Sequence, residues 1–382
     1  MFTLGFSGCG SSGSTACSGS GCTPAPATPE ILYGAPSTEL LNQFINATID
    51  PNTGGFSSVS VGTIPLFDTG GMVAVNARFL YISTTFVNGL PNNGSEIFGY
   101  SINPTTGTLA PIAGSPFTLE AGSSVQGLAS SPNSYFLYAA VAGGIDGFTV
   151  NSATGVPTAI PGSPFASGNN PQLVVDPSGK FLYASDDDPP GRILAFTIGS
   201  SGALTPVQGS PFTIPGQTVA NSVPFGIVDT GAFVYAALTA TNQIAAFSID
   251  GGTGALASVP GSPFSDERNP AVLALADKFL YAVNEADGSI SGYSISSSSG
   301  GLTQIPGSPF VSDSAALAAD PSGKYLYDST YEGILDFNIN PDTGELTLGI
   351  ASLSNDGSLL LMIVQLPSPS AQWATATNFK RF

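Results

Sequence analysis

The chain has 382 residues, of which 8 are Lys or Arg and 26 are Asp or Glu, so its formal net charge is −18. It contains no histidine, which excludes a Ser-His-Asp triad, a histidine zinc site and a histidine general base. The negative charge gives no electrostatic basis for binding nucleic acid. Hydrophobic residues make up 42% and charged residues 9%, so we expect a folded core rather than disorder.

The first 29 residues form a Gly/Ser- and Pro-rich segment, and this composition is typical of a flexible linker. All three cysteines lie in it, at Cys9, Cys17 and Cys22. The string from Phe6 to Cys9 resembles the lipobox of bacterial lipoproteins, which implies acylation of Cys9 and a place in the cell envelope. The stretch from Met1 to Phe6 is shorter than a normal signal and has no Lys or Arg, as a start codon assigned too far downstream would explain.

The alternative for this segment is an unmodified Gly/Ser tail whose cysteines have no role. No run of 18 apolar residues occurs in the chain, so we expect no transmembrane helix. Membrane contact is therefore expected only through a lipid anchor at Cys9, and the location is predicted to be extracytoplasmic, either anchored or secreted.

A repeat occupies the rest of the chain. Gly-Ser-Pro-Phe occurs five times, and a degenerate copy at 62–67 precedes the copies at 114–117, 162–165, 209–212, 261–264 and 307–310. The copies are about 49 residues apart on average. A fixed period of this length indicates a repeat architecture.

Each repeat contains four apolar segments of the kind that form strands. In one unit they are Ala271–Ala276, Lys278–Val283, Ser289–Ile295 and Gly301–Ile305. Period-2 alternation, aromatic and β-branched residues, and Gly/Pro punctuation favour strands over helices. Four antiparallel strands in 40–50 residues are typical of a β-propeller blade.

The number of blades follows from one tyrosine in each second strand. It occurs seven times, at Tyr33, Tyr81, Tyr138, Tyr183, Tyr235, Tyr281 and Tyr327. The first strand occurs six times internally, and Leu359–Gln365 supplies the seventh. The sequence therefore predicts an all-β, seven-bladed propeller over residues 30–367. One C-terminal strand joins three N-terminal strands to close the ring, which removes free edges. Residues 368–382, with Trp373, are predicted to be a tail.

The repeats also resemble a known family, the lactonase-like seven-bladed propellers. These include the propeller-type 6-phosphogluconolactonases and the carboxy-muconate lactonising enzymes. The strings that carry the resemblance run from Asp176 to Tyr183 and from Ala246 to Asp250, together with Pro-Gly-Ser-Pro-Phe. The resemblance covers nearly the whole body and implies the fold more strongly than the activity, because sites on propellers change freely.

The loops of such a propeller fall on two faces. The first-to-second and third-to-fourth turns repeat regularly, and Arg78, Lys180, Lys278 and Lys324 share one position in them. The second-to-third and fourth-to-first loops vary, and we call their side the variable-loop face. Because irregular loops tend to carry function, we expect the site there. To this face we assign Arg192, Arg268 and the acids Asp68, Glu120, Asp186, Asp187, Asp188, Asp266, Glu267, Glu285, Asp287, Asp313, Asp328 and Glu332.

The resemblance implies a set of site residues, of which about half are present. The family's Pro-His pair is matched by Pro171-Gln172, and the amide of Gln172 cannot act as a general base. Asp186 and Arg192 match an acid and an arginine of the following loop, and Asn284-Glu285 matches an Asn-Glu pair. The family's Arg-His pair is replaced by Ala271-Val272, with Arg268 three residues earlier.

Two hypotheses for the function follow. The first is an envelope protein, expected to be a monomer without metal or cofactor, that binds a small molecule or a protein at one end of the channel. The second is a lactone hydrolase acting on an uncharged lactone, with Glu285 activating water and Arg192 stabilising the oxyanion. The acidic face would repel an anionic substrate in either case.

Other roles for these residues remain open. The acids could be ordinary surface carboxylates that maintain solubility. Arg192 could form an ion pair with the run Asp186–Asp188 instead of contacting substrate. That same run could bind calcium through carboxylate oxygens, although its spacing does not match an EF-hand.

Overall fold

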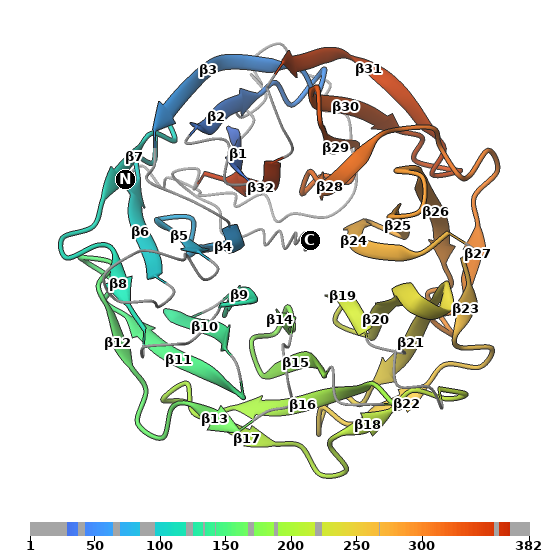
Figure 1. Ribbon diagram of the computed structural model, residues 1–382, viewed down its shortest axis with the longest axis horizontal. Coiled ribbons are helices and arrows are strands. Elements are labelled where there is room, and N and C mark those ends of the chain that lie inside the picture. Colours follow the sequence, from blue (N-terminus) through green and yellow to red (C-terminus); the bar gives the residue numbers. More distant parts are fainter. Residues whose placement is uncertain are drawn as a thin grey trace, which may run out of the picture.

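The computed structural model describes residues 29–36, 43–63, 69–84, 96–119, 125–132, 134–141, 143–166, 172–186, 190–217, 224–266, 268–354 and 359–366. The predicted linker with Cys9 and the predicted tail with Trp373 lie outside these ranges. Seven antiparallel sheets are arranged around a central axis (Figure 1). The predicted seven-bladed propeller is confirmed. Among the described residues, no helix has the length and apolarity needed to cross a membrane.

The first three blades are built as follows, from the innermost strand outward. Blade 1 consists of β32 (Leu359–Gln365), β1 (Glu30–Pro36), β2 (Gln43–Ile49) and β3 (Phe56–Thr63). Blade 2 consists of β4 (Thr69–Val75), β5 (Phe79–Thr84), β6 (Glu96–Ile102), β7 (Leu109–Pro111) and β8 (Phe117–Thr118). Blade 3 consists of β9 (Gly127–Ser130), β10 (Phe136–Val141), β11 (Gly144–Val150), β12 (Pro157–Ala159) and β13 (Phe165–Ala166).

The remaining four blades repeat this plan. Blade 4 consists of β14 (Leu173–Val175), β15 (Phe181–Asp186), β16 (Arg192–Ile198), β17 (Leu204–Pro206) and β18 (Phe212–Thr213). Blade 5 consists of β19 (Pro224–Asp229), β20 (Phe233–Leu238), the 3-10 turn η1 (Thr239–Thr241), β21 (Gln243–Ile249), β22 (Leu256–Ser258) and β23 (Phe264–Ser265). Blade 6 consists of β24 (Pro270–Ala276), β25 (Phe279–Asn284), β26 (Ile290–Ile295) and β27 (Leu302–Gln304). Blade 7 consists of β28 (Ser314–Ala319), β29 (Tyr325–Thr330), β30 (Gly333–Ile339) and β31 (Leu346–Ser354).

The ring is closed where the two ends of the chain share blade 1. The C-terminal strand β32 pairs with β1 in antiparallel register, from Glu30 opposite Gln365 to Pro36 opposite Leu359. The backbone N–H of Leu359 donates to Ser329 Oγ of blade 7 at 2.7 Å, which ties the closing strand to its neighbour. The predicted closure is therefore confirmed, and β32 covers the inner edge of β1.

A ring of hydrogen bonds joins each blade to the next. The tyrosine hydroxyl of every second strand donates to the carbonyl oxygen of a glycine in the third-to-fourth turn of the following blade. The pairs are Tyr33–Gly107, Tyr81–Gly155, Tyr138–Gly202, Tyr183–Gly254, Tyr235–Gly300, Tyr281–Gly344 and Tyr327–Gly54. The last pair, at 2.9 Å, completes the circle from blade 7 to blade 1. The seven tyrosines from which the number of blades was predicted thus also join neighbouring blades.

The glycine of this contact is required by space and by backbone conformation. Gly344 has φ +75°, a left-handed conformation that other residues adopt at a cost. A Cβ there would lie 2.6 Å from the ring of Phe279, two residues before the tyrosine of the preceding blade. The turn can therefore pack against the ring of Phe279 only because position 344 has no side chain.

The Gly-Ser-Pro-Phe motif forms a feature that the sequence did not predict. In blades 2 to 5 its phenylalanine begins a fifth strand of two residues that pairs with the third strand. In blade 3, Phe165 lies opposite Ile145, and Ser163 Oγ accepts a hydrogen bond from the N–H of Gly147 at 2.9 Å. Blade 7 has no copy of the motif, and its outer strand β31 instead runs for nine residues.

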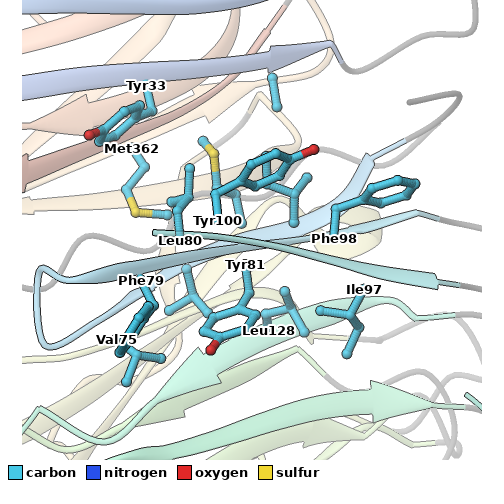
Figure 2. Packing of buried hydrophobic residues seen from close by; sticks show 14 of the residues in the cluster. Tyr33, Val75, Phe79, Leu80, Tyr81, Ile97, Phe98, Tyr100, Leu128 and Met362 are labelled. Carbon is cyan, nitrogen blue, oxygen red and sulfur yellow. The ribbon is translucent and has the colours of Figure 1, made fainter. Parts of the chain in front are cut away.

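The core lies between the blades. Figure 2 shows the packing at blades 1 and 2, where Tyr33 and Met362 of blade 1 lie near Leu80 of blade 2. Tyr81 and Leu128 continue the same buried cluster into blade 3. Neighbouring blades therefore share buried apolar surface throughout this part of the ring.

Candidate functional site

Buried polar residues gather where the second strands reach the variable-loop face. Asp186, Asn284 and Thr330 are the last residues of β15, β25 and β29, and all three are buried. Buried polar groups need hydrogen-bond partners, and these residues find them in the neighbouring loops and strands. The two groups of predicted site residues are built on these strand ends, one in blade 4 and one in blade 6.

In blade 4 the predicted residues Asp186 and Arg192 form an ion pair. They lie opposite each other at the end of the β15–β16 ladder. Arg192 Nε and Nη2 both donate to Asp186 Oδ2, at 2.9 and 2.5 Å. The Asp186 side chain is fully buried and that of Arg192 is 29% exposed. The ion pair that we considered as an alternative role for Arg192 is therefore present. Asp187 and Asp188 lie outside the described residues, so the calcium hypothesis stays a prediction.

Gln172, at the position of the family's expected base, is held by its surroundings. It is 7% exposed and directly precedes β14. Its backbone N–H donates to Ser185 Oγ at 2.8 Å, and its side-chain Nε2 donates to the carbonyl oxygen of Gln126 in blade 3 at 2.9 Å. Its Oε1 is buried and has no hydrogen-bond partner among the residues that the structure describes. The position thus offers a fixed acceptor, without a group that titrates near neutral pH.

In blade 6, Asn284 and Glu285 lie at the turn from β25 to β26. The N–H of Gly288 donates to the carbonyl oxygen of Asn284 at 2.8 Å, which closes the turn. Asn284 is fully buried, and its Nδ2 donates to Ser289 Oγ at 3.0 Å and to Ser291 Oγ at 2.9 Å. Glu285 is exposed in the turn itself. The pair is therefore split into one fixed amide and one carboxylate facing solvent.

The neighbouring charges belong to the same network. Arg268 Nη1 forms an ion pair with Oδ2 of Asp287. The other carboxylate oxygen of Asp287, Oδ1, accepts a hydrogen bond from Ser289 Oγ at 2.6 Å. Asp266 accepts hydrogen bonds from Tyr293 OH at 2.8 Å and Ser291 Oγ at 3.3 Å. Burial raises the pKa of Asp266 above its usual range, while those two hydrogen bonds act in the opposite direction.

One pocket opens beside Glu285, between blades 6 and 7, and a second pocket lies in blade 7. The first has a volume of about 380 Å³ and is lined by Ala271, Val272, Val283, Asn284, Glu285, Gly288, Asp313, Ser314, Ala315 and Tyr331. The second has a volume of about 360 Å³ and includes Glu332 and Asp313 in its lining. Neither described lining contains Lys or Arg. Ala271 and Val272, which replace the family's Arg-His pair, form part of the first wall.

The predicted site residues thus fall into two groups on one face. Gln172, Asp186 and Arg192 belong to blade 4, whereas Glu285 belongs to blade 6, and blade 5 lies between them in the ring (Figure 1). The described lining of the pocket beside Glu285 comes from blades 6 and 7. A single site uniting all four residues stays a prediction.

Three acids that we placed on the variable-loop surface are in fact buried, namely Asp186, Asp266 and Asp328. Asp328 lies inside β29 and accepts a hydrogen bond from Ser312 Oγ. Asp266 is likewise buried. The interpretation as solubilising surface carboxylates is wrong for these three. Hydroxyl groups donate to Asp266 and Asp328, and the guanidinium of Arg192 donates to Asp186. The sequence analysis also missed Ser289, Ser291 and Ser314, although two serines spaced by two in a strand point to one side.

Comparison with known proteins supports the fold. Residues 235–360 match the family model of the lactonase, 7-bladed beta-propeller. A protein from Bacteroides uniformis, provisionally named a 6-phosphogluconolactonase, is similar in structure, with TM-score 0.70, 20% identity, and coverage of 88% of this chain and 99% of that one. A search of curated proteins finds no match.

Two further structures agree. The periplasmic gluconolactonase PpgL of Pseudomonas aeruginosa has TM-score 0.69 and 16% identity, covering 89% of this chain and 100% of that one. A second provisionally named 6-phosphogluconolactonase, from Bacteroides fragilis, has TM-score 0.70 and 19% identity, covering 90% and 100%. The resemblance to lactonase-like seven-bladed propellers is therefore confirmed, and at these identities it extends to the fold alone.

Proposed function

We propose that this chain, whose fold is that of the lactonase-like seven-bladed propellers, is a binding module of the cell envelope that takes a small molecule or a protein on its variable-loop face. The observation that carries the proposal is Gln172 in place of the expected base. Its amide cannot take up a proton near neutral pH, and its Nε2 already donates a hydrogen bond to the carbonyl oxygen of Gln126. An acceptor held in this way suits recognition of a ligand.

The charge of the pocket beside Glu285 supports the choice of ligand. Glu285 and Asp313 line it, and its described lining contains no Lys or Arg. A phosphorylated or carboxylated lactone would be repelled by these carboxylates. The proposed ligand is therefore not an anion.

A second function, hydrolysis of an uncharged lactone, is favoured by one feature. Glu285 is a carboxylate in the lining of a pocket of about 380 Å³, large enough for a small lactone. In this proposal Glu285 activates water and Arg192 stabilises the oxyanion. The ion pair of Arg192 with Asp186 speaks against a free role for that guanidinium.

The proposed location in the cell envelope has two supports. One is the lipobox-like string that ends at Cys9. The other is the periplasmic location in the name of the similar P. aeruginosa protein. Labelling with radioactive palmitate followed by fractionation tests it, and a soluble, unlabelled cytoplasmic protein would contradict the proposal.

The two functions are separated by incubating the purified chain with neutral and phosphorylated lactones. We expect no hydrolysis above the uncatalysed rate, with or without Glu285→Gln. Asp342→Asn, in the exposed turn between β30 and β31 on the opposite face, is a charge-matched control. Hydrolysis that survives in Asp342→Asn and disappears in Glu285→Gln would overturn the binding module and establish the hydrolase.

A further inference from the structure

The pocket between blades 6 and 7 contains two buried polar atoms that lack partners. Asn284 Oδ1 and Ser314 Oγ have no hydrogen-bond partner within the described part of the chain, and both residues line the pocket. Asn284 is 0% and Ser314 9% exposed. A buried acceptor left without a donor destabilises the protein, so two such atoms in the lining of one pocket need a partner that the pocket can admit, such as a ligand or a water molecule.

The orientation of the Asn284 amide is fixed by the serines beside it. Ser289 Oγ donates its hydrogen to Asp287 Oδ1 at 2.6 Å, and Ser291 Oγ donates to Asp266 Oδ1 at 3.3 Å. Each hydroxyl has one hydrogen, so both serines can only accept from Asn284. The amide nitrogen must therefore face the serines, at 3.0 and 2.9 Å. The carbonyl oxygen Oδ1 is left on the other end as a fixed acceptor.

The same pocket carries negative charge. Glu285 and Asp313 are exposed carboxylates in its lining. Arg268, a cation on the adjoining loop, is engaged in its ion pair with Asp287. The N–H of Ser314 donates to the carbonyl oxygen of Gly288 at 2.8 Å, which holds the Asp313 loop of blade 7 against the turn of blade 6. The carboxylates of the two blades are thus brought to one opening.

An aromatic ring completes the lining. Tyr331 follows β29 in blade 7 and is 53% exposed. Aromatic faces attract cations, most strongly where water is partly excluded. A pocket with fixed oxygen acceptors, two carboxylates and an aromatic side chain matches a positively charged group that carries several hydrogens.

We propose that this pocket binds a primary ammonium group of an organic ligand. An ammonium has three N–H donors. Asn284 Oδ1, Ser314 Oγ and a carboxylate oxygen of Glu285 or Asp313 offer three acceptors. The inference rests on the proposed binding function and names the chemical class of its ligand.

The probe is benzylammonium, titrated into the full chain at pH 7 by calorimetry. Benzyl alcohol has the same ring without charge, benzoate reverses the charge, and benzyltrimethylammonium keeps the charge without N–H donors. We expect benzylammonium to bind about tenfold more tightly than the alcohol and the trimethyl compound, in line with a charge-assisted hydrogen bond, and benzoate not to bind. Equal affinity of alcohol and ammonium, or absence of ammonium binding, would overturn the proposal.

Substitutions at the individual acceptors test how much each one contributes to binding of benzylammonium. Asp313→Asn and Glu285→Gln are exposed changes that leave the fold intact, and each should weaken benzylammonium binding about fivefold without changing that of the alcohol. Ser314→Ala should weaken benzylammonium more than benzyltrimethylammonium, because only the former donates to the hydroxyl. Asp342→Asn on the opposite face, with the same change in charge, should alter neither. An equal loss in Asp342→Asn would show that only net charge matters and would overturn the site.

Failure of this inference is distinct from failure of the proposed function. The titration measures binding without turnover, so hydrolysis of a lactone that depends on Glu285 would overturn the binding module while leaving the ammonium affinity as measured. Conversely, equal affinity for benzyl alcohol and benzylammonium would remove the ammonium ligand and leave a neutral ligand for the proposed function.

Discussion

Asp186 and Arg192 lie opposite each other on β15 and β16, and two nitrogens of the guanidinium donate to a single carboxylate oxygen. The carboxylate is fully buried, whereas the guanidinium reaches partly into solvent. The pair therefore closes the end of the β15–β16 ladder in blade 4. It gives Arg192 a structural role, in the position where the family resemblance implied a site residue.

Removal of Arg192 should reveal this role. In Arg192→Ala the buried carboxylate of Asp186 loses its described partner, and breaking a buried ion pair destabilises a protein by about 3 kcal/mol. We expect a loss of this size in the free energy of unfolding measured with urea. Asp186→Asn keeps the shape and an acceptor oxygen and should cost less, about 1 kcal/mol.

The matched control for this prediction is the exposed ion pair of blade 6. Arg268 and Asp287 are 43% and 40% exposed, so Arg268→Ala should change stability by about 0–1 kcal/mol. Equal losses for Arg192→Ala and Arg268→Ala would contradict a structural role specific to the buried pair.

The ring of tyrosine–glycine contacts makes a second prediction. Tyr281 OH donates to the carbonyl oxygen of Gly344 at 2.6 Å, and Tyr281→Phe should lower the free energy of unfolding by about 1 kcal/mol. Gly344→Ala should cost more, about 2 kcal/mol, since it combines backbone strain at φ +75° with a Cβ placed against Phe279. Gly251, in the same kind of turn in blade 5, has open space around its Cα, so Gly251→Ala should be nearly neutral. A neutral Gly344→Ala in the same urea unfolding experiment would refute the proposed packing role.

These contacts also show why the fold could be predicted from the sequence and much of the site could not. The tyrosines recur with the blade period because every blade needs the same contact to its neighbour. The Gly-Ser-Pro-Phe motifs recur because they pair with the third strand of their own blade. The amide of Asn284 is oriented by Ser289 and Ser291, an arrangement described in blade 6 that leaves no periodic signal. The burial of Asp328 is equally local. Periodicity reveals what all blades share, whereas a site consists of what one blade does differently.

The pH dependence of stability follows from two buried acids. Burial, followed by the nearby charge of Asp320, raises the pKa of Glu30 from 4.5 to about 7, with Lys324 acting in the opposite direction. Burial likewise raises the pKa of Asp229 from 3.8 to about 7. Between about pH 4.5 and 7 the folded chain binds more protons than the unfolded chain, so its stability falls as the pH rises through this window.

Glu30→Gln tests the assignment of this effect. The variant removes the titrating group, so the melting temperature should fall less steeply between pH 5 and 7 than in the unchanged chain, by roughly half if Asp229 contributes the remainder. The charge-matched Asp342→Asn should retain the full slope. An unchanged slope in Glu30→Gln would refute the raised pKa of Glu30.

The closure of the ring gives the last prediction. The closing strand β32 is paired with β1 along its whole length and packs against the inner strands β28 and β4 of the two neighbouring blades. A chain ending at Ser358 lacks this strand, so it exposes the edge of β1 and the apolar surfaces of both neighbours. We expect a fall of more than about 10 °C in melting temperature, since several buried apolar side chains are lost together.

Two further variants test whether the loss of stability comes from β32 itself. A chain ending at Pro367 keeps the strand and loses only the predicted tail, so it should melt with the full-length protein. Leu361→Ala removes one buried side chain, at 1% exposure, and should cost about 3 kcal/mol. If the chain ending at Ser358 melts at the full-length temperature, the closure through β32 is wrong. If the chain ending at Pro367 melts as low as the shorter one, the domain boundary at 367 is wrong, because the loss then comes from the tail.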